Sequence, residues 1–350
     1  MDRSVILRCA AIIGVYLVVI ASVTPQAQMD LGPKVEKTYG QGLPRDRDTL
    51  IFADDQYPVW PLTPPQQAYA PINGARMKQH VVNLAKVALR YRDAGHKWWG
   101  RLPGTTADKE GMAYMTKEFE RLGLTVEHHP FDIPEDWRPT DFTASYKTAD
   151  GKTIELTTIF PVSGTKATGP QGVTAEAVWV GVGSGADFIG RDVKGKAIII
   201  YSTFVPGGRS HSASDRAGIF DSNTRAAKLG ATAIIDVMAV PGNAQFEPEG
   251  GVRDVPNFTL SQDEGFALKD RLDNGEKVTM NLKLVVPELK DVQTEYTIAT
   301  LHGMSEEQIV IMTHTDGYFQ GAMDNAAGMA SALELARFYA QKPLARRRVR

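Results

Sequence analysis

The chain has 350 residues, of which 43% are hydrophobic and 23% are charged, and its formal net charge at pH 7 is −2. This length allows two domains, and the composition is ordinary for a globular protein. The small net charge excludes a global electrostatic attraction to nucleic acid or to anionic lipid.

A signal peptide is predicted at residues 1–27. Arg3 and Arg8 give it a positive start, residues 10–23 form a short apolar core, and Ala27 offers a small residue for cleavage. Removal of this segment would make the protein secreted or periplasmic. The alternative is a retained membrane anchor, although the apolar core is shorter than the roughly 20 residues of a typical spanning helix.

An extended arm and the first part of the main domain are predicted next. Residues 28–74 are rich in proline and polar residues, which predicts an arm without a core of its own. Residues 75–140 contain helices predicted at 75–91 and 109–122, and a strand at 124–127. This alternation of helix and strand is typical of α/β proteins.

His128 and His129 follow that strand directly. Adjacent residues of a strand point to opposite faces, so the two imidazoles are not predicted to bind one metal ion. They are expected to be residues at the end of a strand without a metal role.

Residues 141–287 have a different pattern, with short strands separated by glycine turns. Strands are predicted at 177–181, 197–201 and 233–237, and a helix is predicted at 222–229. These alternating elements predict a second compact region inside the main domain.

Two motifs in this region do not predict function. Residues 181–185 are rich in glycine, but a turn and a strand follow them instead of the helix that a dinucleotide site requires. Ser210, His211 and Asp215 lie in one loop, whereas a catalytic triad is assembled from separated segments.

Residues 288–350 carry the strongest functional signal. An unbroken apolar run at 309–312 predicts a buried central strand at 308–312, which leads into His314 and Asp316 and then into Asp324. Ligands collect at the carboxyl ends of strands in open α/β sheets, and zinc prefers imidazole and carboxylate ligands. The sequence therefore predicts His314 and Asp324 as metal ligands, with Asp316 accepting the other ring N–H of the histidine.

A helix is predicted after this site, ending before Lys342 and Pro343. Helical spacing predicts that Met329 and Leu333 lie on its buried side and that Glu334 lies on its polar, wetter side.

The segment from Ile309 to Tyr339 resembles the core motif of the zinc-dependent aminopeptidase family that also contains glutamate carboxypeptidases and the transferrin-receptor ectodomain. The resemblance implies an α/β fold with a mixed sheet flanked by helices, a peptide substrate and two zinc ions. It implies that His314 binds one zinc, that Asp324 bridges both, and that Asp316 is the catalytic-site carboxylate orienting the histidine. It also implies a cis peptide bond between Asp324 and Asn325.

Residues 141–287 resemble the protease-associated β/α domain that is often inserted into these peptidases, and the match is best over residues 176–238. Residues 288–350 are then the second part of the peptidase domain.

The resemblance also implies ligands that this sequence lacks. The family has two glutamates, an aspartate and a histidine after the bridging aspartate, whereas residues 326–350 contain only Glu334 as an acidic residue and no histidine. Glu306 and Glu307 precede His314 and have no predicted catalytic role. We therefore expect the chain to be the N-terminal portion of a longer enzyme, with the C-terminal part of the catalytic domain missing.

These features predict a secreted zinc metallopeptidase, an aminopeptidase that removes N-terminal residues from peptides. Two alternatives stay open: a non-catalytic receptor-like ectodomain of the same fold, and an acyltransferase of the glutaminyl-cyclase type. The basic cluster at residues 346–350 has no interleaved aromatic residues, so no nucleic-acid partner is predicted. The sequence gives no indication of side-chain preference or oligomeric state.

Overall fold

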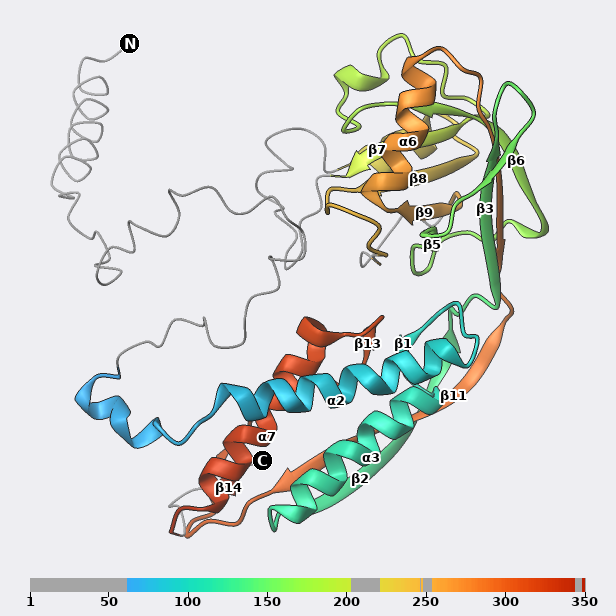
Figure 1. Ribbon diagram of the computed structural model, residues 1–350. Coiled ribbons are helices and arrows are strands. Elements are labelled where there is room, and N and C mark those ends of the chain that lie inside the picture. The colour runs from blue at the N-terminus through green and yellow to red at the C-terminus, as the bar shows by residue number, and fades with distance from the viewer. Residues whose placement is uncertain (1–61, 203–220, 246, 248–253, 344–347, 350) are drawn as a thin grey trace, which may run out of the picture. The chain divides into compact units, whose positions relative to one another are not determined.

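The computed structural model describes residues 62–202, 221–245, 247, 254–343 and 348–349 (Figure 1). The chain divides into two units, residues 1–65 and 66–350, and the second unit contains the elements discussed below. The predicted signal peptide, most of the predicted arm and the loop with Ser210, His211 and Asp215 lie outside the described residues.

Three helices pack on one another: α2 (Gly74–Asp93), α3 (Thr106–Arg121) and α7 (Ala327–Ala340) (Figure 1). Side-chain caps fix where the first two begin, because Asn73 accepts the N–H of Arg76 and Thr105 accepts the N–H of Asp108. The buried side chains that the three helices share are Leu84, Met115, Ala326, Met329 and Leu333. The predicted helices and the apolar side of the last one are thus confirmed.

Strands β2 (Thr125–Asp136) and β11 (Leu289–Thr300) form a two-stranded antiparallel ribbon beside α3. The strand predicted at 124–127 is much longer than expected, so His128 and His129 lie in its middle and not at its end. Pairing with β11 extends the strand through two prolines, which a local pattern treats as breakers. The histidines have separate partners: His128 Nδ1 lies 3.0 Å from Glu295 Oε1, and His129 stacks on Tyr296.

Residues 141–285 contain an eight-stranded mixed sheet in the order β4-β3-β10-β6-β7-β8-β9-β5. Strands β6 to β9 run parallel, and the other pairs are antiparallel. The bounds are β3 (Asp141–Lys147), β4 (Thr153–Glu155), β5 (Phe160–Pro161), β6 (Gly169–Trp179), β7 (Ala197–Ser202), β8 (Ala233–Met238), β9 (Asn257–Leu260) and β10 (Thr279–Val285). The helices of this region are α5 (Ser222–Lys228) and α6 (Gln262–Asp273).

The isoleucines of β7 and β8 are completely buried, which explains why these strands appear in the sequence as continuous apolar runs. The strands and the helix predicted inside residues 141–287 form, and the predicted α/β fold with a mixed sheet is confirmed. The identification of this region as a protease-associated domain stays a prediction.

Short strands carry the segment with the predicted metal ligands. β1 (Gly100–Arg101) pairs antiparallel with β13 (Gly317–Tyr318), and β12 (Gln308–Ile309) pairs parallel with β14 (Arg348–Val349). Short helical segments are η2 (Pro64–Tyr69), η3 (Ala186–Phe188) and η4 (Ala322–Ala326).

The prediction of a buried central strand at 308–312 is wrong. The strand has two residues, and Ile309, Val310 and Met312 are 46%, 60% and 88% exposed. Within the described residues β14 is the one strand that pairs with it, and its apolar side chains stay largely exposed.

No helix in the described part of the chain is both long enough and apolar enough to cross a membrane.

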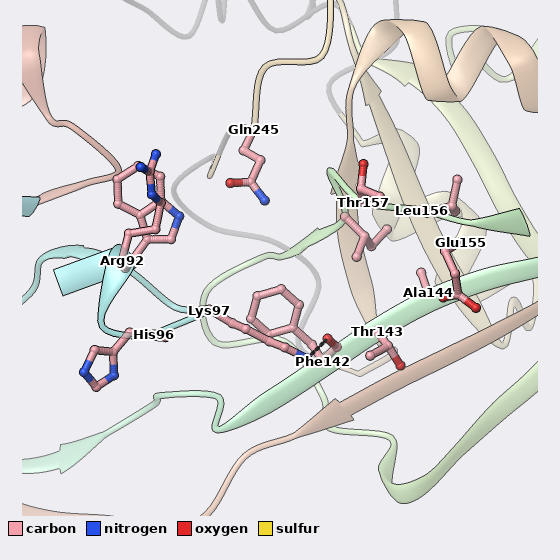
Figure 2. Close-up of a pocket in the computed structure, with 13 residues that line it drawn as sticks. Arg92, His96, Lys97, Phe142, Thr143, Ala144, Glu155, Leu156, Thr157 and Gln245 are labelled. Carbon is pink, nitrogen blue, oxygen red and sulfur yellow. Dashed lines mark hydrogen bonds between the residues drawn. The ribbon is translucent and has the colours of Figure 1, made fainter. Parts of the chain in front are cut away.

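A cavity of about 490 Å³ lies beside the sheet (Figure 2). Its lining residues are Arg92, Gly95, His96, Lys97, Trp99, Phe142, Thr143, Ala144, Glu155, Leu156, Thr157, Ile159 and Gln245. Two of its basic side chains are already compensated by carboxylates, Arg92 by Asp93 and Lys97 by Asp141. His314, Asp316 and Asp324 are not part of this lining, so the cavity is separate from the predicted metal ligands.

Candidate metal centre

His314 and Asp316 lie in the extended segment between β12 and β13. The Nδ1 atom of His314 is 2.9 Å from Oδ1 of Asp316. Because an ionised carboxylate can only accept, this contact places the proton on Nδ1. The Nε2 atom of the neutral ring then presents its lone pair to the opposite side.

Asp324 occupies that opposite side. Its Oδ1 atom lies 3.1 Å from Nε2 of His314. In the neutral ring with its proton on Nδ1, Nε2 and the carboxylate oxygen are both acceptors. Such a contact is stable only when a proton or a metal ion lies between the two atoms.

The separation of these two atoms fits a zinc ion. Zinc takes nitrogen and oxygen ligands at about 2.0–2.2 Å in tetrahedral geometry, so two ligand atoms of one ion lie roughly 3.3 Å apart. The side chains of His314 and Asp324 are 53% and 70% exposed, so an ion can reach them. Within the described residues no group of three or more histidine, cysteine or acidic side chains that could hold a metal ion is found, so His314 and Asp324 meet there as a pair.

Asn325 connects the two segments of the site, a role that the sequence analysis missed. The peptide bond between Asp324 and Asn325 is cis, as the resemblance implied. The side-chain amide of Asn325 donates to Oγ1 of Thr313 at 2.9 Å and accepts the backbone N–H of Gly328 at 3.1 Å. A Cβ atom at residue 328 would lie 2.3 Å from the Asn325 oxygen, so any other residue there would displace this hydrogen-bonded amide. The start of α7 is thereby tied to the residue before His314.

Arg101 is a second residue that the sequence analysis missed. Its side chain is completely buried, and its guanidinium donates to the carbonyls of Thr315, Gln320 and Gly321 at 3.0–3.1 Å. Burial lowers the pKa of Arg101, while the charges of Asp316 and Asp324 act in the opposite direction. Its sequence position gave no signal of burial, because an arginine after a glycine in a short stretch without helical or strand periodicity is read as a turn residue.

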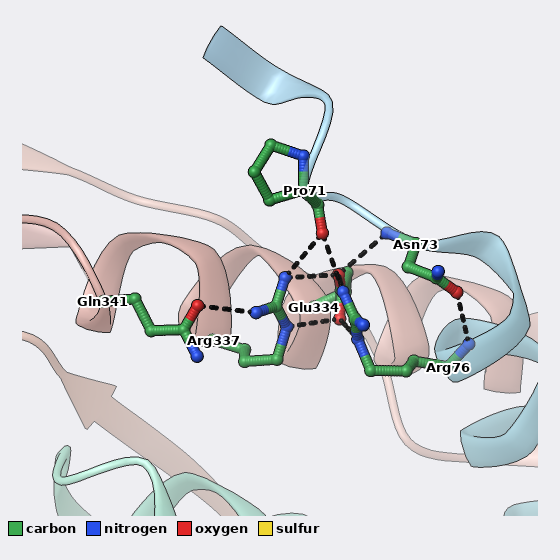
Figure 3. A network of polar contacts seen from close by, with 6 residues as sticks. All are labelled: Pro71, Asn73, Arg76, Glu334, Arg337 and Gln341. Carbon is green, nitrogen blue, oxygen red and sulfur yellow. Dashed lines mark hydrogen bonds and ion pairs between the residues drawn. The ribbon is translucent and has the colours of Figure 1, made fainter.

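Glu334 is buried, so its predicted position on the wetter side of the helix is wrong. Its carboxylate, 1% exposed, accepts hydrogen bonds from Arg76, Arg337 and the N–H of Asn73 (Figure 3). Burial raises the pKa of Glu334, but the hydrogen bonds from Arg337, Arg76 and Asn73 outweigh it and lower the pKa to about 2. The carboxylate therefore joins α7 to α2 through these hydrogen bonds and has no predicted part in metal binding.

The sequence has recognisable relatives. Residues 297–350 match the model of Peptidase family M28, and this stretch contains His314, Asp316 and Asp324. Carboxypeptidase Q of Xenopus laevis is 25% identical over 240 residues, covering 65% of this chain and 49% of the relative. Carboxypeptidase Q of Rattus norvegicus is 23% identical over 273 residues, covering 71% of this chain and 54% of the relative. The chain spans about half the length of these relatives.

Solved structures share the fold. A peptidase M28 precursor from Shewanella amazonensis aligns with a TM-score of 0.61 and 20% identity, covering 81% of this chain and 64% of that one. A zinc aminopeptidase from Bacillus subtilis aligns with a TM-score of 0.57 and 21% identity, covering 80% of this chain and 60% of that one.

Proposed function

We propose that this chain, which belongs to the zinc-dependent M28 family of aminopeptidases and carboxypeptidases, is part of a peptidase that binds zinc through His314 and Asp324. The proposal rests on one observation above all, the 3.1 Å separation between His314 Nε2 and Asp324 Oδ1. That separation, with the Nδ1 proton directed to Asp316, presents two zinc donors toward one point.

We propose further that the complete site holds two zinc ions and that Asp324 bridges them. A carboxylate has two oxygens, and Oδ1 is the atom that faces His314. The described residues bring together two donors, fewer than zinc requires, so the remaining ligands and the general base come from other residues.

The residues of this chain have distinct tasks in that site. Zinc, when bound, acts as a Lewis acid on a carbonyl and lowers the pKa of water. Asp316 holds the imidazole of His314 in one tautomer and one orientation. Asp324 supplies negative charge from the turn that enters α7, and Asn325 keeps that turn against Thr313.

The cleavage mode that we propose is removal of N-terminal residues, as the name of the Bacillus subtilis neighbour indicates for that protein. The name Carboxypeptidase Q favours removal of C-terminal residues as a second candidate. An aminoacyl p-nitroanilide, a peptide blocked at its N-terminus and a peptide with N-terminal glutamine separate aminopeptidase, carboxypeptidase and glutaminyl-cyclase activity. We also propose that the protein acts outside the cytoplasm, and N-terminal sequencing of the secreted protein tests this.

Metal analysis tests the proposed function directly. The protein isolated from its natural source is expected to contain zinc by elemental analysis, because His314 Nε2 and Asp324 Oδ1, 3.1 Å apart, are spaced as two ligand atoms of one zinc ion are. Dialysis against a chelator should abolish peptide hydrolysis, and added zinc should restore it. A folded protein that contains no zinc would favour the receptor-like alternative, and hydrolysis that resists chelation would exclude the metal mechanism.

Asp316→Asn is expected to weaken zinc binding and kcat/KM by about 10- to 100-fold, the usual effect of losing the carboxylate behind a metal-bound histidine. An amide is a weaker acceptor for Nδ1–H, so it no longer fixes the tautomer that directs Nε2 toward Asp324. Competition with a chromophoric chelator measures the zinc affinity. The matched control is Asp132→Asn on β2, an exposed aspartate, which should leave the affinity unchanged. Equal affinities for the Asp316→Asn variant and the wild type would contradict the assigned role.

A further inference from the structure

The guanidinium of Arg101 holds the loop that separates the two candidate zinc ligands. Nε donates to the carbonyl of Thr315 at 3.0 Å, Nη1 to that of Gln320 at 3.0 Å and Nη2 to that of Gly321 at 3.1 Å. Nη1 also lies 3.4 Å from the carbonyl of Leu84 on α2. The planar guanidinium thus binds the backbone at Thr315, directly after His314, and again at Gln320 and Gly321, shortly before Asp324.

The surrounding backbone leaves room for this side chain at three glycines. A Cβ atom at Gly321 would lie 2.8 Å from Nη2, and one at Gly317 would lie 3.3 Å from the same atom and 2.2 Å from the backbone oxygen of Asp324. A Cβ atom at Gly111 on α3 would lie 3.2 Å from Cδ. The loop and the helix are therefore shaped around Arg101.

The burial of Arg101 is costly unless its charge is compensated. Within the described residues its hydrogen bonds all go to main-chain carbonyls, which carry only partial negative charge. Taking an arginine out of water without a partner carboxylate costs several kcal/mol. The nearby charges of Asp316 and Asp324 offset part of this cost across the loop. Arg101 therefore interacts with the predicted site in two ways: through the charges of Asp316 and Asp324, and through its hydrogen bonds to the backbone of the loop.

We propose that Arg101 is the positioning residue of the zinc site: it fixes the loop from Thr315 to Gly321 so that His314 and Asp324 face each other at ligand distance. This inference rests on the proposed function and deepens it. Arg101 touches neither ligand side chain and acts only through the backbone between them. Three planar donors in a fixed arrangement can hold three carbonyls at once, whereas the single ammonium of a lysine cannot reproduce that fork.

Arg101→Lys tests this inference because it keeps the charge and removes the fork. In the naturally produced protein, the zinc dissociation constant is expected to rise by about 10- to 100-fold, as for other supporting residues of metal sites. The visible absorption of the cobalt-substituted protein should change, since it reports ligand geometry. In the metal-free protein, amide hydrogen exchange at residues 315–321 should become faster.

Arg76→Lys is the matched control. Arg76 is also an arginine bound to a main-chain carbonyl, that of Pro71, but its other partner is Glu334 and not the metal loop. This variant is expected to lower the melting temperature without changing the zinc affinity or the cobalt spectrum. An equal loss of zinc affinity in both lysine variants would mean that general destabilisation is the cause, and it would overturn the positioning role.

Gly111→Ala tests the positioning role of Arg101 if the Arg101→Lys variant does not fold. Alanine is the better helix former, so α3 itself is not weakened, while the added methyl displaces the stem of Arg101 by a few tenths of an ångström. A weaker zinc affinity in this variant supports the inference, and an unchanged affinity overturns it. A wild-type protein that binds no zinc would instead remove the proposed function itself, so the two failures are distinguishable.

Discussion

Asp324→Ala is expected to lower kcat/KM of the naturally produced protein by about 10³-fold or more and to reduce its zinc content. Removing one group that stabilises developing charge costs about 10²- to 10³-fold, and this substitution also removes a metal ligand. The imidazole of His314 would be left without the carboxylate oxygen that lies 3.1 Å from its Nε2 atom. Elemental analysis and hydrolysis of a chromogenic peptide measure the two effects.

The same variant should remain folded. The side chain of Asp324 is 70% exposed, and substitutions of exposed side chains change the free energy of unfolding by about 0.5 kcal/mol or less. Asp273→Ala at the end of α6 is the matched control and should keep full activity and zinc content, because among the residues that the structure describes Asp273 pairs with Lys269 and with no predicted metal ligand. Hydrolysis that survives both Asp324→Ala and chelation would remove the metal mechanism.

Glu334→Gln is expected to lower the free energy of unfolding at pH 7 by about 3 kcal/mol. The pKa of Glu334 is about 2 in the folded protein and 4.5 for an ordinary glutamate, and each unit of difference corresponds to about 1.4 kcal/mol. The glutamine would also leave two arginines, Arg76 and Arg337, without their shared carboxylate. Denaturant unfolding followed by circular dichroism measures the loss.

The pH dependence of this loss has a defined sign. The folded-state pKa is depressed, so the contribution of Glu334 is complete above about pH 4.5 and disappears as the pH falls toward about 2. The difference between wild type and variant should therefore shrink over that range and stay constant above it. Glu110→Gln, which removes a carboxylate from an exposed pair with Arg90, is the control and should cost less than about 1 kcal/mol. A Glu334→Gln variant as stable as the wild type at pH 7 would contradict the network as described.

The sequence alone determined the features that depend on neighbouring residues. Spacing of apolar residues located α2, α3, α7 and the strands β6, β7 and β8 of the eight-stranded sheet, because a helix or strand repeats over a few residues whatever lies around it. The order of His314, Asp316 and Asp324 predicted the candidate ligands, and the contact between His314 and Asp316 follows from their separation by a single residue in extended chain.

The tertiary structure decided which charges are buried and what holds the ligands. Arg101 binds the backbone of the loop at Thr315, which is 214 positions away in the sequence. Glu334 accepts a hydrogen bond from Arg76, which is 258 positions away. Helical periodicity placed Glu334 on the polar side because it records only the helix itself and not the arginine that another helix contributes. The exposure of β12 has the same physical reason: an apolar run predicts a buried strand, but burial requires covering segments, and within the described residues β14 alone pairs with it.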